Sequence, residues 1–350
     1  MRNAAVLVGL VLFSVSAALR AGEPPVAPKL VAKPDAFQTL VNPNCSHCID
    51  EAKRRSKELR DDDRVLVWTR GKYDGGAIPI RFFLNTYRVI SDSYGTFVYD
   101  PDAGYARGFP ASYDYRFHGW RNGVMVMKHK DGTLFSCLSG IAFDGPRKGE
   151  KLEFWPTVEA NWGWYVKHYP GGVAYHMYDK YVPVEVPAKP NEDSLKSRGK
   201  ADPRYPPEQM VLGIDRKDKP VAFPLAMLEC LGPFAVGNEN SDPKSPVVVL
   251  WQSSIRSAAA YLPTAAKHKP PTKLGVEGEI EATKTGLEIV ADGKSADAPF
   301  LDTKTGSRFD ICGRCTEGEL KGYTLVPVPA VMCKWFAWAA EFPNTAIYGK

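Results

Sequence analysis

The chain has 350 residues, of which 44% are hydrophobic and 11% are aromatic. This composition is typical of a folded globular protein and excludes a fibrous or wholly disordered one. The formal net charge is +5, and loss of Arg2 and Arg20 with a leader would lower it by two to +3. Because no long basic run accompanies this mild charge, we expect no nucleic-acid partner.

Residues 1–21 have the pattern of a secretory signal peptide. Arg2 supplies the charged start, the apolar run AAVLVGLVLFSVSAA follows, and small residues end the segment. The run is short for a membrane span, and no second apolar run of that length occurs. We therefore expect an exported, soluble mature chain, periplasmic or extracellular, without a membrane span. Retention of the segment as an N-terminal anchor is the alternative.

The next segments predict a leader, a helix and then a series of strands. Residues 22–37 are rich in proline and predict a flexible leader. After a turn at 42–44, apolar spacing and C-terminal basic residues predict a helix over 46–59. Two further helices are predicted over 158–168 and 331–341. The best strand candidates are 64–69, 124–128, 247–252 and 258–262.

An internal repeat determines the expected architecture. Residues 137–175 align without a gap with residues 310–348, and ten of the 39 pairs are identical. The shared residues fix turns and core positions, and they include the pairs Gly140/Gly313, Gly145/Gly318, Gly149/Gly322, Pro156/Pro329, Trp162/Trp335, Pro170/Pro343 and Tyr175/Tyr348. The stretch 65–84 also resembles 211–228. The chain is therefore built twice from one unit, which is too long for a solenoid repeat.

The repeat predicts a mainly β fold with an α+β tendency, in two β-rich lobes with a few short helices. The first lobe, with the predicted N-terminal helix, covers 38–182, and the second covers 210–350. Residues 183–209, rich in proline and charge, predict a linker. Two such copies commonly leave a cleft between them, which is the default ligand site. The tryptophans 162, 164, 335 and 338 fall at helical spacing and are expected in the core.

The first candidate site is Cys45-Ser46-His47-Cys48. Two thiols at a predicted helix start can close a small disulfide ring, and the helix N-terminus stabilises a thiolate. The local order of strand, cysteine pair and helix is that of a thioredoxin-type site, although the rest of such a domain is absent. Redox chemistry, metal ligation and a structural disulfide all stay open for Cys45 and Cys48.

The second candidate is Cys312-Gly313-Arg314-Cys315. Its counterparts in the first copy are Ser139 and Ala142, so the shared fold does not require these cysteines. Four thiolates from Cys45, Cys48, Cys312 and Cys315 would suit tetrahedral zinc, and His47 could add a nitrogen ligand. A zinc or copper ion is the cofactor that this pattern suggests. The other cysteines, 137, 230 and 333, stand among apolar residues and are expected to be buried.

Several stretches resemble the DUF3179 family of exported bacterial and archaeal proteins. They are DGTLFSCLSGIAFDGP, the VLG and AFPL pieces of 211–228, and TLVPVPAVMCKWFAWAAEFPNTAIY. The resemblance covers about residues 38–350 and implies export and a duplicated core, but no activity. Members typically carry a Cys-Pro-x-Cys-Gly motif, at whose cysteine positions this chain has Asp100 and Ala103. The region of Cys45 and Cys48 resembles a subgroup in which some relatives are labelled selenoproteins.

Two function classes follow from these observations. The first is an exported thiol-redox or metal-handling protein that acts through Cys45 and Cys48, with another exported protein as its partner. The second is a non-catalytic binding or structural module whose cysteines form stabilising disulfides. The sequence contains no GxSxG, Walker or dinucleotide-binding fingerprint, so hydrolase, ATPase and dehydrogenase functions have little support.

Overall fold

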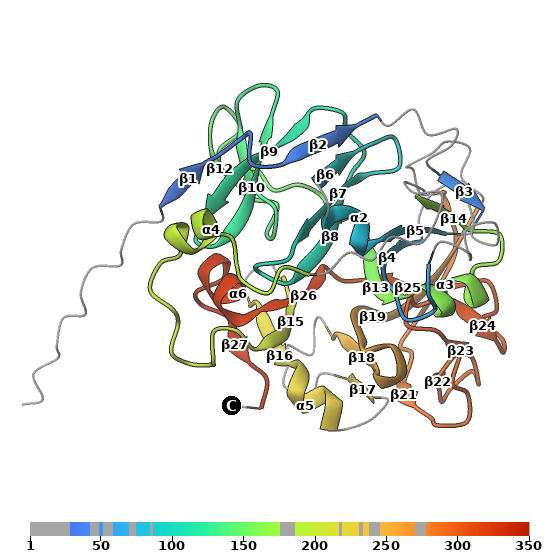
Figure 1. Cartoon of the computed structure of the whole chain (residues 1–350). Helices are drawn as coiled ribbons and strands as arrows, with labels where there is room; N and C mark the ends of the chain where they lie inside the picture. The colour runs from blue at the N-terminus through green and yellow to red at the C-terminus, as the bar shows by residue number, and fades with distance from the viewer. Residues whose placement is uncertain are drawn as a thin grey trace, which may run out of the picture.

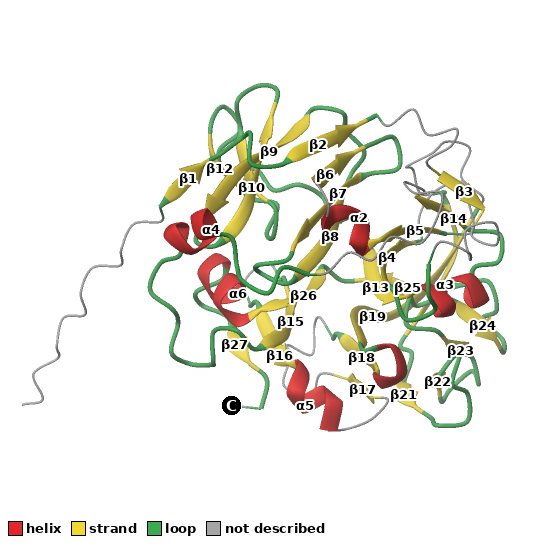
Figure 2. Ribbon diagram, in the orientation of Figure 1, coloured by secondary structure: helices red, strands yellow, loops and turns green. Residues whose placement is uncertain are grey.

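Strands dominate the protein, and its helices are short (Figure 2). The computed structural model describes residues 29–42, 49–51, 59–69, 75–84, 87–175, 186–216, 219–230, 234–237, 246–269 and 278–349. Within these residues no helix is long and apolar enough to cross a membrane. The prediction of a mainly β fold with a few short helices is confirmed.

In its described residues, the first copy forms three sheets and two short helices (Figure 1). Its strands are β1 (Leu30–Ala32), β2 (Gln38–Val41), β3 (Ile49–Glu51), β4 (Arg64–Trp68), β5 (Gly76–Pro79), β6 (Tyr87–Ser91), β7 (Thr96–Asp100), β8 (Tyr105–Phe109), β9 (Tyr115–Arg121), β10 (Val124–His129), β11 (Leu134–Ser136), β12 (Ala142–Asp144), β13 (Thr157–Asn161) and β14 (Val173–Tyr175). The helices are α2 (Ile80–Leu84) and α3 (Trp162–His168). The strand orders are β1-β9-β10-β11-β12, β2-β6-β7-β8 and β13-β4-β5-β14-β3.

The second copy follows α4 (Glu192–Ser197) and has the same three-sheet plan. Its strands are β15 (Met210–Ile214), β16 (Val221–Pro224), β17 (Phe234–Gly237), β18 (Val248–Gln252), β19 (Ser257–His268), β20 (Ile280–Thr285), β21 (Ile289–Ala291), β22 (Phe300–Asp302), β23 (Arg308–Phe309), β24 (Cys315–Glu317), β25 (Thr324–Pro327), β26 (Ala330–Lys334) and β27 (Ala346–Ile347). The helices are α5 (Leu225–Cys230), the 3-10 turn η1 (Ser253–Ile255) and α6 (Trp335–Glu341). The strand orders are β26-β15-β16-β27, β17-β18-β19-β20 with β25 beside β19, and β21-β22-β23-β24.

The predicted repeat is present in the structure. A shift of 173 residues places β12, β13 and α3 on β24, β26 and α6, with identical bounds. In both copies the equivalent sheet has one parallel pair, formed by β14 with β5 and by β27 with β16. The four tryptophans expected in the core, 162, 164, 335 and 338, are all buried.

Both repeat helices begin later than the sequence pattern predicts. Helices were expected from residues 158 and 331, but α3 begins at Trp162 and α6 at Trp335. The residues before each tryptophan are extended because they pair antiparallel with β4 in the first copy and with β15 in the second. Sheet pairing over a whole strand therefore outweighs the weak helical spacing of these residues.

One glycine pair shows why the repeat retains its small residues. Gly140 and Gly313 have φ angles of 72° and 78°, in the left-handed region. A Cβ atom would lie 2.9 Å from the ring of Phe109 at Gly140, and 2.7 Å from the ring of Tyr261 at Gly313. Only glycine both adopts a positive φ easily and lacks the Cβ atom that would strike the ring. The two copies therefore keep the same glycine turn, packed against an aromatic ring at the equivalent position.

Two of the hydrophobic clusters are shared between the two copies. One contains α3 and β4 of the first copy together with Phe300 and Phe309 of the second. The other contains α6 and β15 of the second copy together with Phe117 and Trp120 of the first. The boundaries at 38–182 and 210–350 thus separate two sequence copies whose cores are interlocked.

The strand β4 links its own copy to the other one. Alternate side chains of a strand point to opposite faces of the sheet. Val65 and Val67 are buried in the cluster with the second copy, while Leu66 and Trp68 are buried against the first copy's own strands. This explains the continuous apolar run of 64–68, because both faces of the strand are covered.

The N-terminal predictions need correction where the structure describes them. Residues 49–51 form β3 rather than part of a helix over 46–59, because they pair antiparallel with β14. Residues 30–32, expected in a flexible leader, form β1 and pair with β9. Within the predicted linker, α4 is capped by the Asn191 side chain and packs on β9 and β1. Cys45, His47 and Cys48 lie outside the described residues.

Candidate functional site

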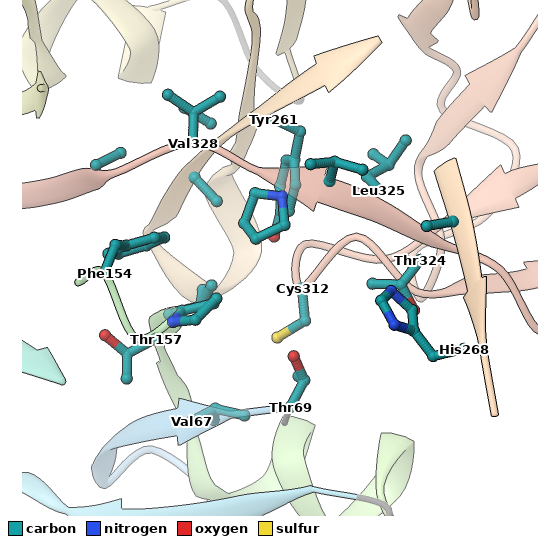
Figure 3. Close-up of a pocket in the computed structure, with 18 of the residues that line it drawn as sticks. Val67, Thr69, Phe154, Thr157, Tyr261, His268, Cys312, Thr324, Leu325 and Val328 are labelled. Atoms are coloured by element: carbon teal, nitrogen blue, oxygen red, sulfur yellow. The ribbon is translucent and has the colours of Figure 1, made fainter. Parts of the chain in front are cut away.

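A cavity of about 370 Å³ lies where the two copies meet (Figure 3). Its wall contains residues at equivalent positions of the repeat, namely Phe154 with Pro327 and Thr157 with Ala330. The cleft expected between the copies is therefore present, close to the axis that relates them. The lining residues that Figure 3 labels are Val67, Thr69, Phe154, Thr157, Tyr261, His268, Cys312, Thr324, Leu325 and Val328.

Most of this cavity wall is apolar, and two of its polar groups already have partners. The Tyr261 hydroxyl donates a hydrogen bond to the Ile311 carbonyl at 2.7 Å. The His268 Nδ1 lies 3.0 Å from the Gly278 carbonyl. Three threonines, 69, 157 and 324, supply the remaining polar side chains of the wall other than Cys312. The cavity thus offers a large apolar surface with a few hydrogen-bonding groups, as small-molecule sites do.

Cys312 brings the second predicted cysteine motif to this cavity. Its sulfur points into the interior, toward Thr69 (Figure 3). Burial raises the pKa of the Cys312 thiol well above its ordinary value, and the charge of Asp310 raises it further. The Tyr169 hydroxyl acts in the opposite direction but more weakly. The thiol is therefore protonated at neutral pH and acts as a weakly polar part of the wall.

Cys315, the other member of the motif, lies on β24 outside the cavity wall. Its Sγ donates a hydrogen bond to the Glu317 carbonyl at 3.2 Å, and burial raises its pKa to about 11. None of the five cysteines that the structure describes forms a disulfide. Among the described residues, no group of three or more histidine, cysteine, aspartate or glutamate side chains could hold a metal ion.

The isolated cysteines differ in burial. Cys137 and Cys333 are buried as expected, and each lies in the cluster that α6 shares with the first copy. Cys230 was also expected to be buried but is exposed. It is the last residue of α5, whose buried side chains are Leu225 and Leu228, so the apolar face of this short helix does not extend to it.

A buried polar cluster that the sequence did not reveal supports the Cys312 turn. Asp310 is fully buried and accepts a hydrogen bond from the Arg314 backbone N–H at 3.0 Å. The Arg314 guanidinium lies 3.5 Å from the same carboxylate, and 4.1 Å above the Tyr169 ring. Tyr169 comes from the first copy and donates to Asp310 at 3.4 Å. The cluster therefore fastens the second cysteine motif to α3 of the other copy.

Ionisation of the buried Asp310 should make the free energy of unfolding depend on pH. Burial raises its pKa to about 6, so the folded state favours the neutral acid relative to the unfolded chain. This contribution is fully present below about pH 4 and is lost as the pH rises through about 6. Between pH 4.5 and 7.5, the free energy of unfolding of the natural protein should fall by on the order of 2 kcal/mol more than that of Asp310→Asn. Urea unfolding of both proteins at the two pH values measures the difference, and a difference independent of pH would contradict this expectation.

Asp100, at one cysteine position of the family motif, is fully buried at the end of β7. Its carboxylate accepts hydrogen bonds from the backbone N–H groups of Asp102, Ala103 and Met125, at 3.0 to 3.1 Å. Burial raises the pKa of Asp100 to about 7, while these three donors act to lower it. Residues 100–104 therefore form a turn that the Asp100 carboxylate holds together.

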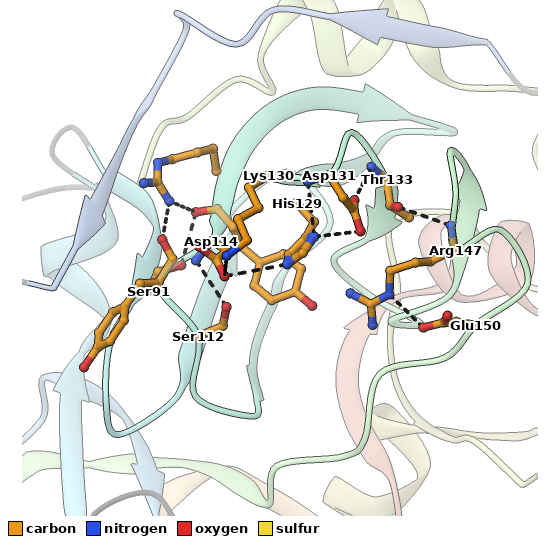
Figure 4. A network of polar contacts seen from close by, with 12 residues as sticks. Ser91, Ser112, Asp114, His129, Lys130, Asp131, Thr133, Arg147 and Glu150 are labelled. Carbon is orange, nitrogen blue, oxygen red and sulfur yellow. Dashed lines mark hydrogen bonds and ion pairs between the residues drawn. The ribbon is translucent and has the colours of Figure 1, made fainter.

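A polar network on the β9–β10 side of the first copy has a simpler structural role (Figure 4). The His129 Nδ1 lies 3.0 Å from Asp131, and its Nε2 lies 3.8 Å from Asp114. Asp131 also accepts a backbone hydrogen bond from Thr133 at 2.8 Å, and bonds from Thr133 lower its pKa to about 2. These contacts brace two turns, and the network lines neither the cavity between the copies nor the smaller cavity beside Asp100.

The match to a family model decides the family. The model described as "Protein of unknown function (DUF3179)" matches residues 120–345, which is more than half of the chain. The protein belongs to the DUF3179 family. No curated protein and no solved structure matches the chain. The DUF3179 segment includes residues 137–175, residues 310–345 of the second repeat member and the Cys312 turn, but not Cys45, Cys48 or Asp100.

Proposed function

We propose that this DUF3179 protein is a non-catalytic binding module that holds a small, largely apolar molecule between its two copies. The cavity of about 370 Å³ is the observation that carries this proposal. Its volume falls within the range of about 300–1,000 Å³ that is usual for small-molecule sites. Because both copies contribute to the wall, the site depends on the duplicated fold as a whole.

The chemistry of the wall favours binding over catalysis. Among the described residues of the wall, Cys312 is the one with a thiol, and burial keeps it protonated, so it lacks the thiolate that nucleophilic or redox chemistry needs. Tyr261 is committed to a backbone carbonyl. The ligand class that fits is an uncharged molecule with an apolar body, such as an aromatic or branched hydrocarbon skeleton, and one or two groups that hydrogen-bond to the threonines.

Filling the cavity tests the proposal. Thr157 is half-buried and lines the cavity, so Thr157→Phe should add a ring at its wall and reduce the ligand space. We expect this variant to bind the apolar fluorescent probe N-phenyl-1-naphthylamine about tenfold more weakly than the natural protein, or worse. A fluorescence titration at fixed pH measures the dissociation constant of each protein.

Thr264→Phe is the matched control. Thr264 is also half-buried on a strand, but it does not line the cavity. Its probe affinity should stay within about threefold of the natural protein's. Equal binding by the natural protein and Thr157→Phe would overturn the proposal, because the probe would then bind elsewhere.

A thiol-redox or metal-handling role for Cys45 and Cys48, with His47, stays a prediction, as does export by residues 1–21. The one observation that bears on thiol chemistry in the described part is the Cys312 sulfur in the cavity wall. Cys312→Ser distinguishes ligand binding from thiol chemistry at this cavity. The variant should bind the probe with an affinity within about threefold of the natural protein's, but should lose any reaction that needs the Cys312 thiol. Thiol titration with metal analysis of the native protein tests the Cys45 and Cys48 pair.

A further inference from the structure

A second cavity, of about 180 Å³, lies in the first copy beside the Asp100 turn. Its wall combines charged and aromatic residues, namely Phe37, Arg88, Asp100, Asp102, Trp120 and Lys189. Pro187, Lys189 and Asn191 belong to the segment that joins the two copies and pass over the cavity before α4 begins. The site is therefore closed by the connection between the copies rather than by the shared fold.

Arg88 is buried in this wall without a carboxylate partner. It is only 4% exposed, and its Nη1 donates to the carbonyls of Phe83 and Tyr87. The guanidinium carbon lies 4.0 Å from the centre of the Phe37 ring. Within the described residues no ion pair at contact distance joins Arg88 to an acidic group, and its Nη1 is the guanidinium nitrogen with hydrogen-bond partners. Burial lowers the pKa of Arg88, while the more distant charges of Asp100 and Asp102 raise it. The Nε and Nη2 donors can therefore serve an acceptor in the cavity.

Asp102 presents the opposite charge in the same wall. It is 6% exposed, and its two carboxylate oxygens share one donor, the Asn191 backbone N–H, at 3.1 and 3.2 Å. Asp100, by contrast, is fully satisfied by three backbone N–H groups. An ionised carboxylate can accept about four hydrogen bonds, so Asp102 has capacity left for a ligand.

The charges of the wall select a dipolar ligand. Arg88 and Lys189 are positive and Asp102 is negative, while Asp100, with a pKa of about 7, is partly ionised at neutral pH, so the wall carries charges of both signs. A lone anion would meet the two carboxylates, and a lone cation would meet the two basic groups. A carboxylate pairs with the guanidinium in a two-pronged geometry, and an ammonium group donates to Asp102. The aromatic rings of Phe37 and Trp120 leave an apolar wall for a short side chain.

In the described residues, the equivalent turn of the second copy lacks the two aspartates. The β7–β8 turn corresponds to the β18–β19 turn, since Gly104 and Arg256 hold the same left-handed position with φ of 69° and 47°. Gln252 stands at the place of Asp100 and donates to Ser254 and to the Ala296 carbonyl. Charged residues that appear in one copy only are not required by the fold.

We propose that the cavity lined by Arg88 and Asp102 binds a small zwitterion, an α-amino acid with a short side chain. The ligand carboxylate pairs with the free face of the Arg88 guanidinium, and its ammonium group donates to Asp102. This site is distinct from the cavity between the copies and takes a different class of molecule.

Calorimetric titration of the full chain with glycine, L-alanine and L-proline tests the proposal. We expect saturable binding of at least one of them, about tenfold tighter than that of acetate or methylammonium, which each carry a single charge. Equal affinity for acetate would mean a simple anion site, and an absence of saturable binding up to about 10 mM would mean that water fills the cavity. Either result overturns the proposal, and both are obtained with the natural protein.

Asp102→Asn provides the variant test, because the amide oxygen can still accept the Asn191 N–H while the charge is lost. It should weaken amino-acid binding about tenfold or more. The matched control Asp114→Asn removes a carboxylate from the surface network instead and should bind as the natural protein does. Thr157→Phe, which fills the other cavity, should also leave amino-acid binding unchanged. Unaltered binding by Asp102→Asn would refute the assigned ligand pose.

Discussion

Each copy of the repeat should fail to fold when it is expressed alone. We expect the fragments 29–200 and 201–350 to show no cooperative thermal transition separately, and to regain one when mixed in equal amounts. The reason is that each of two hydrophobic clusters takes residues from both copies, α3 and β4 lying in one and α6 and β15 in the other. Alone, the second fragment would expose apolar surface that the first copy covers, including Phe336, which packs near Gly123 and under the Arg198 guanidinium.

The control has the same cut in the chain, but the cut is made after the two copies have folded together. Residues 199–201 are exposed, so a protease site inserted there can be cut after the full chain has folded. The cut protein should stay assembled and unfold in one transition, observed by circular dichroism during heating. A sharp transition for either fragment alone would show that the copies have independent cores, and would contradict the interlocked arrangement.

The duplicated plan of the fold could be predicted from sequence because its determinants are local. Glycines at left-handed turns and tryptophans at the helix starts recur at a fixed shift of 173, and the structure keeps both. The sharing of two hydrophobic clusters between the copies could not be predicted in the same way. Sequence patterns show which residues of 162–168 and 335–341 are apolar, but not that residues of the other copy join them in one cluster.

The wrong predictions, a helix over 46–59 and helix starts at 158 and 331, share one physical cause. Residues 49–51 follow a turn and have a helix-like spacing, but β14 offers them an edge to pair with. The residues before Trp162 and Trp335 are extended because β4 and β15 pair with them. In each case a partner strand distant in sequence supplies backbone hydrogen bonds that no local pattern reveals.

The candidate sites were predicted unevenly. The cleft between the copies followed from the duplication alone, and Cys312 in its wall followed from a cysteine that the other copy lacks. The cavity beside Asp100 was not predicted from the sequence. Arg88, which gives that cavity its positive charge, stands in the short strand β6 with nothing in its neighbours to mark it. Only the fold brings Arg88, Asp102 and Lys189 to one cavity.

Truncation of Trp335 should destabilise the whole protein, not one copy. Its side chain is fully buried, and its Nε1 donates to the Asp202 carbonyl at 3.1 Å. We expect Trp335→Ala to lower the free energy of unfolding by roughly 3–5 kcal/mol, through the lost apolar contacts and the cavity left behind. Urea unfolding followed by circular dichroism measures this change.

Two comparisons make the Trp335 result interpretable. The equivalent residue of the first copy, Trp162, is also fully buried, so Trp162→Ala should cost a similar amount and shift the same single transition. Leu195→Ala is the surface control, because Leu195 is 45% exposed and should change stability by less than about 0.5 kcal/mol. A cost below about 1 kcal/mol for Trp335→Ala would show that this ring is not a core anchor. Two separate transitions in either tryptophan variant would show that the shared clusters do not couple the copies, since one interlocked core must unfold as a unit.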